Sequence, residues 1–253
     1  AEGRTVIRNA AAEPHIQDFA LFLQQMGASI SGIGSNTLTV AGVKTLKGAV
    51  HRVTSDHTEA GSLLAAAAAT GGDVTVTGID PGHYRMTRRM FDLLGVELSF
   101  SGDEVRVRSE QSRRVKLPRG GGMPFIDDGP WPQFPSDLMS SMIVLATQVH
   151  GTVLFFEKMY ESRMYFVDRL IAMGANAVIC DPHRVVICGP SKLHGIDLSS
   201  PDIRAGMALV GAALCAEGTS CISNVQLIDR GYVAIDKKLS RLGANIRRID
   251  MAP

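Results

Sequence analysis

The sequence predicts an α/β fold of three strand-helix-strand-helix-strand-strand repeats, preceded by the tail of a second domain of the same kind. Two observations lead to this prediction. Amphipathic helical segments ending in Met-Gly or Leu-Gly recur along the chain and precede alternating apolar and polar residues typical of strands. More apolar helical segments precede three of them. One repeat alone would leave apolar helix faces uncovered, so we expect the helices to pack inward and the sheets to lie outside.

The helices that end in glycine occur four times. Glycine suits the position after a helix because it readily adopts the left-handed backbone conformation. These helices are predicted at residues 19–27, 86–95, 164–174 and 233–243. The strands that follow them are predicted at residues 28–30 and 37–40, 96–100 and 105–107, 177–179 and 184–187, and 244–249.

A more apolar helix opens each of the last three units. These helices are predicted at residues 62–70, 138–149 and 205–216, followed by extended segments at 73–76, 151–156 and 217–224. Because the whole pattern occurs three times between about residues 48 and 250, we predict a complete three-repeat domain over residues 48–253. One wall of an active-site cleft is expected on this domain.

The first residues of the chain repeat a later segment. Residues 2–9 are a recognisable copy of residues 217–224, so the chain is expected to open in the middle of a repeat. Residues 1–47 are therefore predicted to be the remnant of an N-terminal repeat domain. Such a remnant would expose apolar surface, so the missing N-terminal half is a predicted partner.

Composition bounds the possible functions. The chain has 253 residues, 45% of them hydrophobic, and a formal net charge of +1, as expected for one or two soluble domains. It has no run of Lys and Arg that predicts nucleic-acid binding, and no apolar stretch of about 18 residues that predicts a membrane span. The four cysteines are not at metal-ligand spacing, so we expect no metal site. They have apolar neighbours, so we expect buried thiols and a reducing, cytoplasmic location.

Asp137 follows a rigid, proline-rich segment that holds the single tryptophan, Trp131, and ends where a helix is predicted to start. Two interpretations are open. Ser136 or Asp137 caps the helix that begins near Leu138, which is the interpretation that propensity favours. Alternatively, Asp137 is a catalytic carboxylate at the mouth of a cleft.

Three arginines precede helices, where their charge opposes the helix dipole unless an anion is present. They are Arg163, Arg204 and Arg230. Repeat symmetry would bring them to one rim, where they would form a site for a small phosphate- or carboxylate-bearing molecule. The alternative is that each arginine pairs with an acid nearby in the sequence, namely Glu161, Asp202 and Asp229 respectively.

Four motifs carry a resemblance to a known family. They are Phe134-Pro135-Ser136-Asp137, Glu161-Ser162-Arg163-Met164, Asp202-Ile203-Arg204-Ala205 and Ile228-Asp229-Arg230-Gly231-Tyr232. In this order the chain resembles the UDP-N-acetylglucosamine 1-carboxyvinyltransferases over essentially its whole length. The resemblance implies an inverted α/β barrel of the enolpyruvyl transferase type, with two such domains closing over the substrates.

The resemblance also implies an activity. It is that of a transferase that moves the enolpyruvyl group of phosphoenolpyruvate to the 3-hydroxyl of UDP-N-acetylglucosamine and releases phosphate, without metal or cofactor. This is the first committed step of peptidoglycan synthesis, and so concerns cell wall biogenesis, cell shape and cell division. By the resemblance, Asp137 is the general base and contacts the sugar, and Met159 contacts the nucleotide through its backbone. Arg163, Arg204 and Arg230 contact phosphoenolpyruvate.

One position departs from the family pattern. His57 stands where the family has an arginine, between the retained Asp56 and Glu59, which puts an inter-domain contact in question. The family's mobile catalytic loop belongs to the N-terminal half, so this chain is expected to be inactive alone. The alternatives are the shikimate-pathway enolpyruvyl transferase, which shares the fold, and a non-catalytic repeat module such as an RNA-binding domain.

Overall fold

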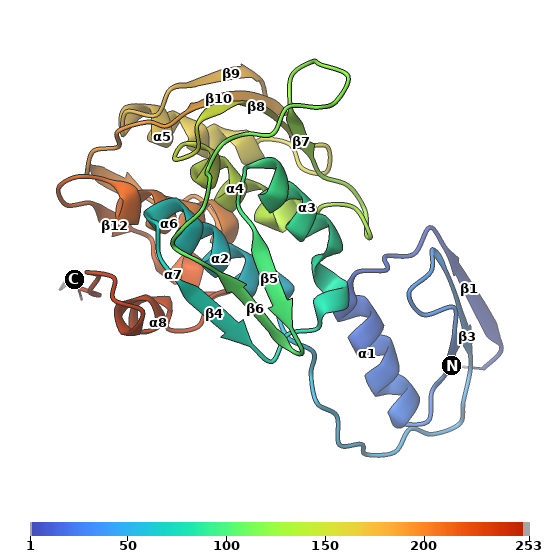
Figure 1. The fold of residues 1–253 in the computed structure, drawn as a ribbon. Coiled ribbons are helices and arrows are strands. Elements are labelled where there is room, and N and C mark those ends of the chain that lie inside the picture. Colours follow the sequence, from blue (N-terminus) through green and yellow to red (C-terminus); the bar gives the residue numbers. More distant parts are fainter. Residues whose placement is uncertain (1, 250–253) are drawn as a thin grey trace.

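The computed structural model describes residues 2–249 (Figure 1). Its α-helices are α1 Pro14–Gln25, α2 His57–Thr70, α3 Arg85–Leu93, α4 Met139–Ala146, α5 Val167–Ala172, α6 Ile203–Cys215, α7 Gln226–Asp229 and α8 Ile235–Arg241. Its 3-10 helices are η1 Pro81–Tyr84, η2 Ser136–Leu138 and η3 Arg163–Phe166. Its strands are β1 Arg4–Arg8, β2 Ser29–Ser31, β3 Thr37–Ala41, β4 Val74–Thr77, β5 Leu98–Ser101, β6 Glu104–Val107, β7 Phe125–Asp127, β8 Gly151–Phe156, β9 Ala177–Asp181, β10 Arg184–Gly189, β11 Asp197–Ser199 and β12 Cys221–Ser223.

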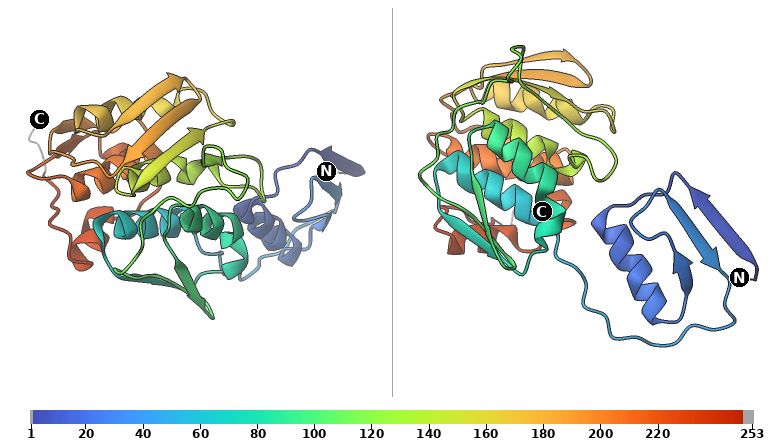
Figure 2. Two further views of the ribbon diagram at one scale, coloured as in Figure 1. Left: turned by 45° about the horizontal axis from the view of Figure 1, so that its top comes forward. Right: turned by 45° about the vertical axis from the view of Figure 1, so that its right-hand side comes forward.

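Three helices from three successive repeats form the centre of the larger body. Helices α2, α4 and α6 contact one another and lie side by side in both views of Figure 2. Every residue of α4 is buried, and α2 buries an almost continuous run of alanines. A helix that is apolar on all sides is stable only when it is enclosed, and the small alanine side chains let the three helices approach closely.

The sheets cover the outside of these helices, as the sequence predicts. Their strand orders are β4-β6-β5, β7-β8-β10-β9 and β11-β12. Strand β6 shows how each sheet divides its faces: Val105 and Val107 are fully buried, while Arg106 between them is exposed and pairs with Asp73. The predicted α/β architecture, with helices inside and sheets outside, is confirmed.

The predicted strand at residues 244–249 is wrong. This segment has no regular secondary structure in the structure. Strand β12 pairs only with β11 among the described residues, and residues 244–249 do not add to its other edge. Instead Arg248 places its guanidinium on Asp229, with N–O distances of 2.8 and 2.6 Å.

The prediction of buried cysteines is also wrong in part. Cys180 and Cys221 are exposed, whereas Cys188 and Cys215 are half-buried, and all four are free thiols. Cys180 is exposed because it lies on β9, the edge strand of its sheet, where alternate side chains point to solvent.

Residues 4–41 form a smaller unit in which α1 covers the antiparallel sheet β1-β3-β2. Residues 42–56 connect it to α2 without a helix or strand, and Figure 2 shows the unit beside the larger body. It exposes apolar side chains, including Phe19, Ile7 and Leu21, which are 58%, 46% and 45% exposed. The assignment of residues 1–47 to the remnant of an N-terminal repeat domain, and of residues 48–253 to a complete three-repeat domain, stays a prediction. Residues 1 and 250–253 lie outside the described part. None of the helices within residues 2–249 has the length and apolar character to cross a membrane.

Candidate functional site

Asp137 joins two arginines from two other segments of the chain. Its Oδ1 accepts a hydrogen bond from Arg163 Nη1 at 3.1 Å, and its Oδ2 accepts one from Arg204 Nη2 at 2.9 Å. Asp137 lies in η2, Arg163 begins η3 and Arg204 lies in the first turn of α6. The prediction that repeat symmetry brings three arginines to one rim therefore holds for Arg163 and Arg204, which meet at Asp137.

Asp137 does not cap a helix. The helix that follows, α4, receives no side-chain hydrogen bond at its N-terminus. The 3-10 helix η2 also lacks a side-chain hydrogen bond at its N-terminus, so the capping interpretation is wrong. The carboxylate is 38% exposed and holds the two guanidinium groups, which are only 14% and 18% exposed.

The acids near each arginine in the sequence are not its partners, so the alternative of local pairing is wrong for Arg163 and Arg204. Asp202 caps α6 by accepting hydrogen bonds from the backbone N–H groups of Arg204 and Ala205, at 2.7 and 2.9 Å. Asp229 holds Arg248. Asp202 and Asp229 thus satisfy other groups, and Arg163 and Arg204 reach across to Asp137.

The Arg163 side chain is fixed from two sides. Its Nη1 also donates to Ser136 Oγ at 2.8 Å, and its guanidinium lies over the ring of Tyr160, 4.3 Å from the ring centroid. Ser162, immediately before it, has a left-handed backbone with φ of 67°, which turns the chain sharply into η3. Ser136 and Tyr160 were not predicted as site residues, although both adjoin predicted ones.

Arg204 is held by a buried tyrosine. Its Nη1 donates to Tyr232 Oη at 3.3 Å, and the same hydroxyl bonds Ser62 Oγ at 2.9 Å. Burial raises the pKa of Tyr232, so its hydroxyl stays neutral. Burial acts to lower the pKa of Arg204, but Tyr232 and Asp137 outweigh it and raise that pKa. Arg204 is therefore a permanent cation at this rim.

A cavity of about 650 Å³ opens beside Asp137 and Arg204. Trp131, Met159 and Tyr160 line it from the larger body. Pro14, His15 and Ile16 line it from the start of α1, and Val53 to Thr58 line it from the connection and the start of α2. This volume suits a ligand of small-molecule size, and polar groups converge at one part of the wall.

Two predicted ligand contacts fit this cavity less directly. The Met159 side chain lines it, but the Met159 backbone N–H donates to Glu157 Oε1 at 3.0 Å, so its free backbone group for a ligand is the carbonyl. Neither Arg163 nor Arg230 is among the residues that line the cavity, but Arg163 reaches Asp137, whereas Arg230 is exposed. The structure therefore brings Asp137, Arg163 and Arg204 together and leaves Arg230 outside this group.

His57, at the position where the resemblance led us to expect an arginine, belongs to a cluster of rings at the cavity wall. Its ring centroid is 6.0 Å from that of His83 and 5.9 Å from that of Trp131. Burial lowers the pKa of His57, so the ring is neutral at pH 7. Asp56 caps α2 through the N–H groups of Thr58 and Glu59.

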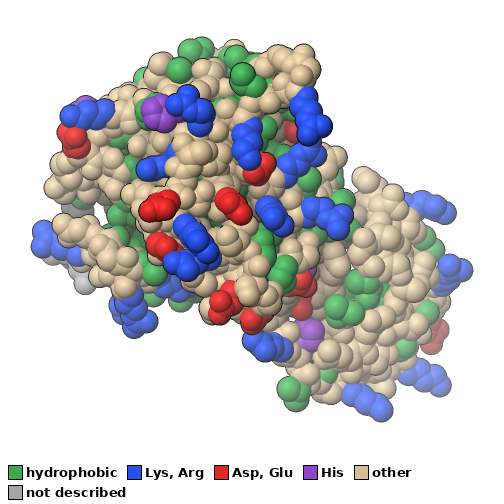
Figure 3. All heavy atoms as spheres, in the orientation of Figure 1, with side chains coloured by type: hydrophobic (Ala, Val, Ile, Leu, Met, Phe, Trp, Pro, Cys, Tyr) green, Lys and Arg blue, Asp and Glu red, His purple; other side chains and the backbone are tan. Residues whose placement is uncertain are grey.

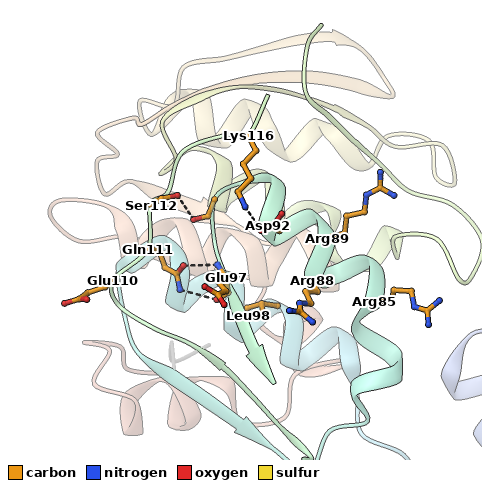
Figure 4. A pocket seen from close by; sticks show the side chains of 11 residues that line it. Arg85, Arg88, Arg89, Asp92, Glu97, Leu98, Glu110, Gln111, Ser112 and Lys116 are labelled. Atoms are coloured by element: carbon orange, nitrogen blue, oxygen red, sulfur yellow. Dashed lines mark hydrogen bonds and ion pairs between the residues drawn. The ribbon is translucent and has the colours of Figure 1, made fainter. Parts of the chain in front are cut away.

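A second cavity, of about 640 Å³, lies against α3 and carries charges of both signs (Figure 4). Lys116 pairs with Asp92 at 2.6 Å, and Gln111 bonds the backbone of Glu97. Arg85 and Arg89 point away from the other labelled side chains in Figure 4, so the cations do not converge on one point. Within the described residues, no group of three or more His, Cys, Asp or Glu side chains is arranged to hold a metal ion.

Comparisons with known proteins agree on one family. The family model described as EPSP synthase (3-phosphoshikimate 1-carboxyvinyltransferase) matches residues 1–239. A protein of Borreliella burgdorferi named UDP-N-acetylglucosamine 1-carboxyvinyltransferase is 55% identical over 98% of this chain and 58% of its own length. One of the same name from Bacteroides thetaiotaomicron is 46% identical over the same shares. The chain thus spans less than two thirds of the curated relatives it matches.

Solved structures show the same fold. The enolpyruvyl transferase NikO from Streptomyces tendae superposes with a TM-score of 0.81 at 25% identity, over 100% of this chain and 58% of its own. EPSP synthase from Acinetobacter baumannii gives a TM-score of 0.74 at 19% identity, over 99% of this chain and 59% of its own, and supports the fold alone. From the family model and the named relatives together, this chain belongs to the enolpyruvyl transferase family.

Proposed function

We propose that this chain forms one wall of the active site of a UDP-N-acetylglucosamine 1-carboxyvinyltransferase. The observation that carries the proposal is the Asp137 carboxylate held between Arg163 and Arg204 at the edge of the cavity. A carboxylate beside two fixed cations is what a reaction needs if it removes a hydroxyl proton and binds a phosphorylated carboxylic acid. The names of the relatives support UDP-N-acetylglucosamine as the acceptor and a carboxyvinyl group as the group transferred, and the resemblance implies phosphoenolpyruvate as the donor.

In the proposed reaction Asp137 accepts the proton of the sugar 3-hydroxyl. At the same time the hydroxyl oxygen of the sugar bonds to C2 of phosphoenolpyruvate. The methylene carbon of phosphoenolpyruvate takes up a proton, which gives a tetrahedral intermediate. Loss of phosphate and of a proton from the methyl group restores the double bond. Arg204 from the cavity wall, with Arg163 and Arg230, which are not among the lining residues, binds the phosphate and carboxylate of phosphoenolpyruvate. We place the reaction in the cytoplasm and in peptidoglycan synthesis. Through peptidoglycan synthesis it would contribute to cell wall biogenesis, cell shape and cell division.

The contacts of Asp137 indicate that the two arginines also control how strong a base it is. Both its oxygens accept hydrogen bonds from guanidinium groups. An anionic substrate that draws these groups toward itself leaves the carboxylate with fewer donors, and a carboxylate with fewer donors is a stronger base. Binding of phosphoenolpyruvate would in this way prepare Asp137 for the hydroxyl proton.

We also propose that residues 1–47 belong to a second repeat domain that closes the other side of the cavity. The apolar side chains exposed on residues 4–41 and the greater length of the named relatives support this. Phosphate release by residues 1–253 alone would contradict it.

The test is phosphate release from phosphoenolpyruvate by the full-length protein, with either UDP-N-acetylglucosamine or shikimate 3-phosphate as acceptor. We expect release with the nucleotide sugar and quenching of Trp131 fluorescence, because Trp131 lines the cavity. Turnover with shikimate 3-phosphate alone would overturn the proposal in favour of the shikimate-pathway enzyme.

A non-catalytic RNA-binding module predicts neither activity but an affinity for RNA that falls steeply with salt. On the face in Figure 3, positive and negative side chains are interspersed, which does not favour it.

A further inference from the structure

Two acidic side chains lie completely buried beneath the proposed site. Asp128 and Glu157 are each 0% exposed. They are neighbours because β7 pairs in parallel with β8, with Asp127 opposite Phe156, and each acid is the first residue after the end of its strand. Buried carboxyl groups are costly unless they are bonded or neutral, so this pair needs a physical explanation.

The donors around Glu157 come from the site itself. Its carboxylate accepts hydrogen bonds from Ser136 Oγ at 2.8 and 2.9 Å and from the N–H groups of Met159 and Tyr160 at 3.0 and 3.1 Å. Ser136 immediately precedes Asp137, and Met159 and Tyr160 line the cavity. Glu157 therefore ties the η2 segment to the segment that holds Met159.

Asp128 has fewer donors. Its Oδ1 accepts from the backbone N–H of Lys158 at 2.6 Å, while its Oδ2 is enclosed without a donor partner among the described residues. Its side chain lies within hydrogen-bonding reach of Glu157. Two carboxyl groups can form a hydrogen bond only if one of them holds a proton.

Burial, followed by the hydrogen bond with Asp128, raises the pKa of Glu157, and Ser136 and Arg163 offset this only in part. The surrounding charged groups do not neutralise two negative charges. Lys158 Nζ is bound to Asp127 Oδ2 at 2.6 Å, and His183 bonds the backbone carbonyl of Glu157 instead of its carboxylate. The charged side chain that faces Glu157 is Arg163, whose Nε lies 4.0 Å from Glu157 Oε2.

Arg163 links the pair to the proposed base. Its Nη1 donates to Ser136 Oγ, which donates to Glu157, and the same Nη1 donates to Asp137 Oδ1. Arg163 thus lies within 4.0 Å of Glu157 Oε2 and also binds Asp137. If the buried pair carried two negative charges, Coulomb attraction in this enclosed setting would draw the guanidinium toward Glu157 and away from Asp137.

We propose that Asp128 and Glu157 share one proton and act as a positioning pair, which keeps Arg163 directed toward Asp137 and the cavity. The proton lies in the hydrogen bond between the two carboxyl groups, so the pair carries a single negative charge. That charge is satisfied by Ser136 and the backbone N–H groups, and Arg163 remains available to Asp137 and to an anionic ligand. The functional part of this inference rests on the proposed function.

The first test reads the proton directly, by infrared spectroscopy of the full-length protein across a pH titration. We expect a protonated-carboxyl band at neutral pH that is absent from Asp128→Asn and Glu157→Gln. In each variant an amide N–H donates to the remaining carboxylate and takes the place of the proton. Asp127→Asn, at a partly exposed carboxylate in the next position, is the matched control and should retain the band. A wild-type spectrum without the band, or a band that survives both substitutions, would overturn the inference.

The second test concerns positioning. In the wild type, kcat for phosphate release should fall as pH rises and the pair loses its proton, and Asp128→Asn, which has no shared proton to lose, should remove this fall with little change in KM. An unchanged profile would show that the pair does not act through Arg163. If the protein releases no phosphate at all, the proposed function fails, but the infrared result still decides whether the proton is shared. Thermal melting of each variant shows whether it has folded. If Asp128→Asn does not fold, Glu157→Gln is used in its place.

Discussion

Replacing Asp137 by asparagine separates its two proposed tasks, because the amide keeps the shape of the side chain and loses its charge. Each of the two hydrogen bonds to arginine is charge-assisted, and such bonds typically contribute about 1.5–3 kcal/mol. The carboxylate is 38% exposed, so solvent screening reduces that value, and we expect about 1–2 kcal/mol in total for the pull on the two guanidinium groups.

That free energy currently opposes any anion that competes for the same arginines. In Asp137→Asn the competition is gone, so inorganic phosphate or phosphoenolpyruvate should bind the full-length protein about 5–30 times more tightly. Turnover should move in the opposite direction and fall by roughly 10²–10⁴-fold, the usual effect of removing a positioned base.

The assay pairs Trp131 fluorescence, which follows ligand binding, with phosphate release, which follows turnover. Asp92→Asn is the control, because Asp92 is also paired with a cation but lies in the other cavity. A loss of turnover of less than threefold would refute the role of Asp137 as base. Weaker anion binding in the variant would refute the competition between Asp137 and the ligand for the arginines.

Three further predictions follow from the same contacts. Tyr232→Phe removes the hydroxyl between Ser62 and Arg204, and should lower the free energy of unfolding by about 1 kcal/mol in chemical denaturation and raise KM for phosphoenolpyruvate. Arg230→Gln should change stability by no more than about 0.5 kcal/mol, since Arg230 is exposed, while raising the same KM; an unchanged KM would remove Arg230 from the site. Burial and Asp128 raise the pKa of Glu157 to about 7, so between the ordinary glutamate pKa and about 7 the folded state binds more protons than the unfolded state. Stability should therefore fall as pH rises through this window, and Glu157→Gln should remove that slope in denaturation curves at a series of pH values.

Much of the fold follows from local rules that the sequence displays. The four predicted helix ends at Gly27, Gly95, Gly174 and Gly243 all have positive φ, between 70° and 106°, as a glycine after a helix should. The strand predicted at 244–249 is wrong because a strand also needs to pair with a partner, and the residue pattern alone does not reveal whether it does.

The pairing within the candidate site could not be predicted in the same way. Proximity in the sequence favoured Asp202 as the partner of Arg204, and helix geometry decided otherwise. The backbone N–H groups at the start of α6 need an acceptor, and Asp202 satisfies two of them. Once its nearest acid is used as a cap, Arg204 extends to an acid 67 positions away, on another repeat.

This division of acids between capping and pairing accounts for the position of the site. In the first and third repeats, Asp56 and Asp202 cap the helices α2 and α6. The corresponding helix of the second repeat, α4, has no side-chain cap, because the 3-10 turn η2 precedes it and directs Asp137 away from its N-terminus. The repeat that breaks the capping rule thus supplies a carboxylate free to hold arginines from two other segments. A capping acid restored at the start of α4 would compete with that arrangement, so the irregular turn is the local feature on which the proposed chemistry depends.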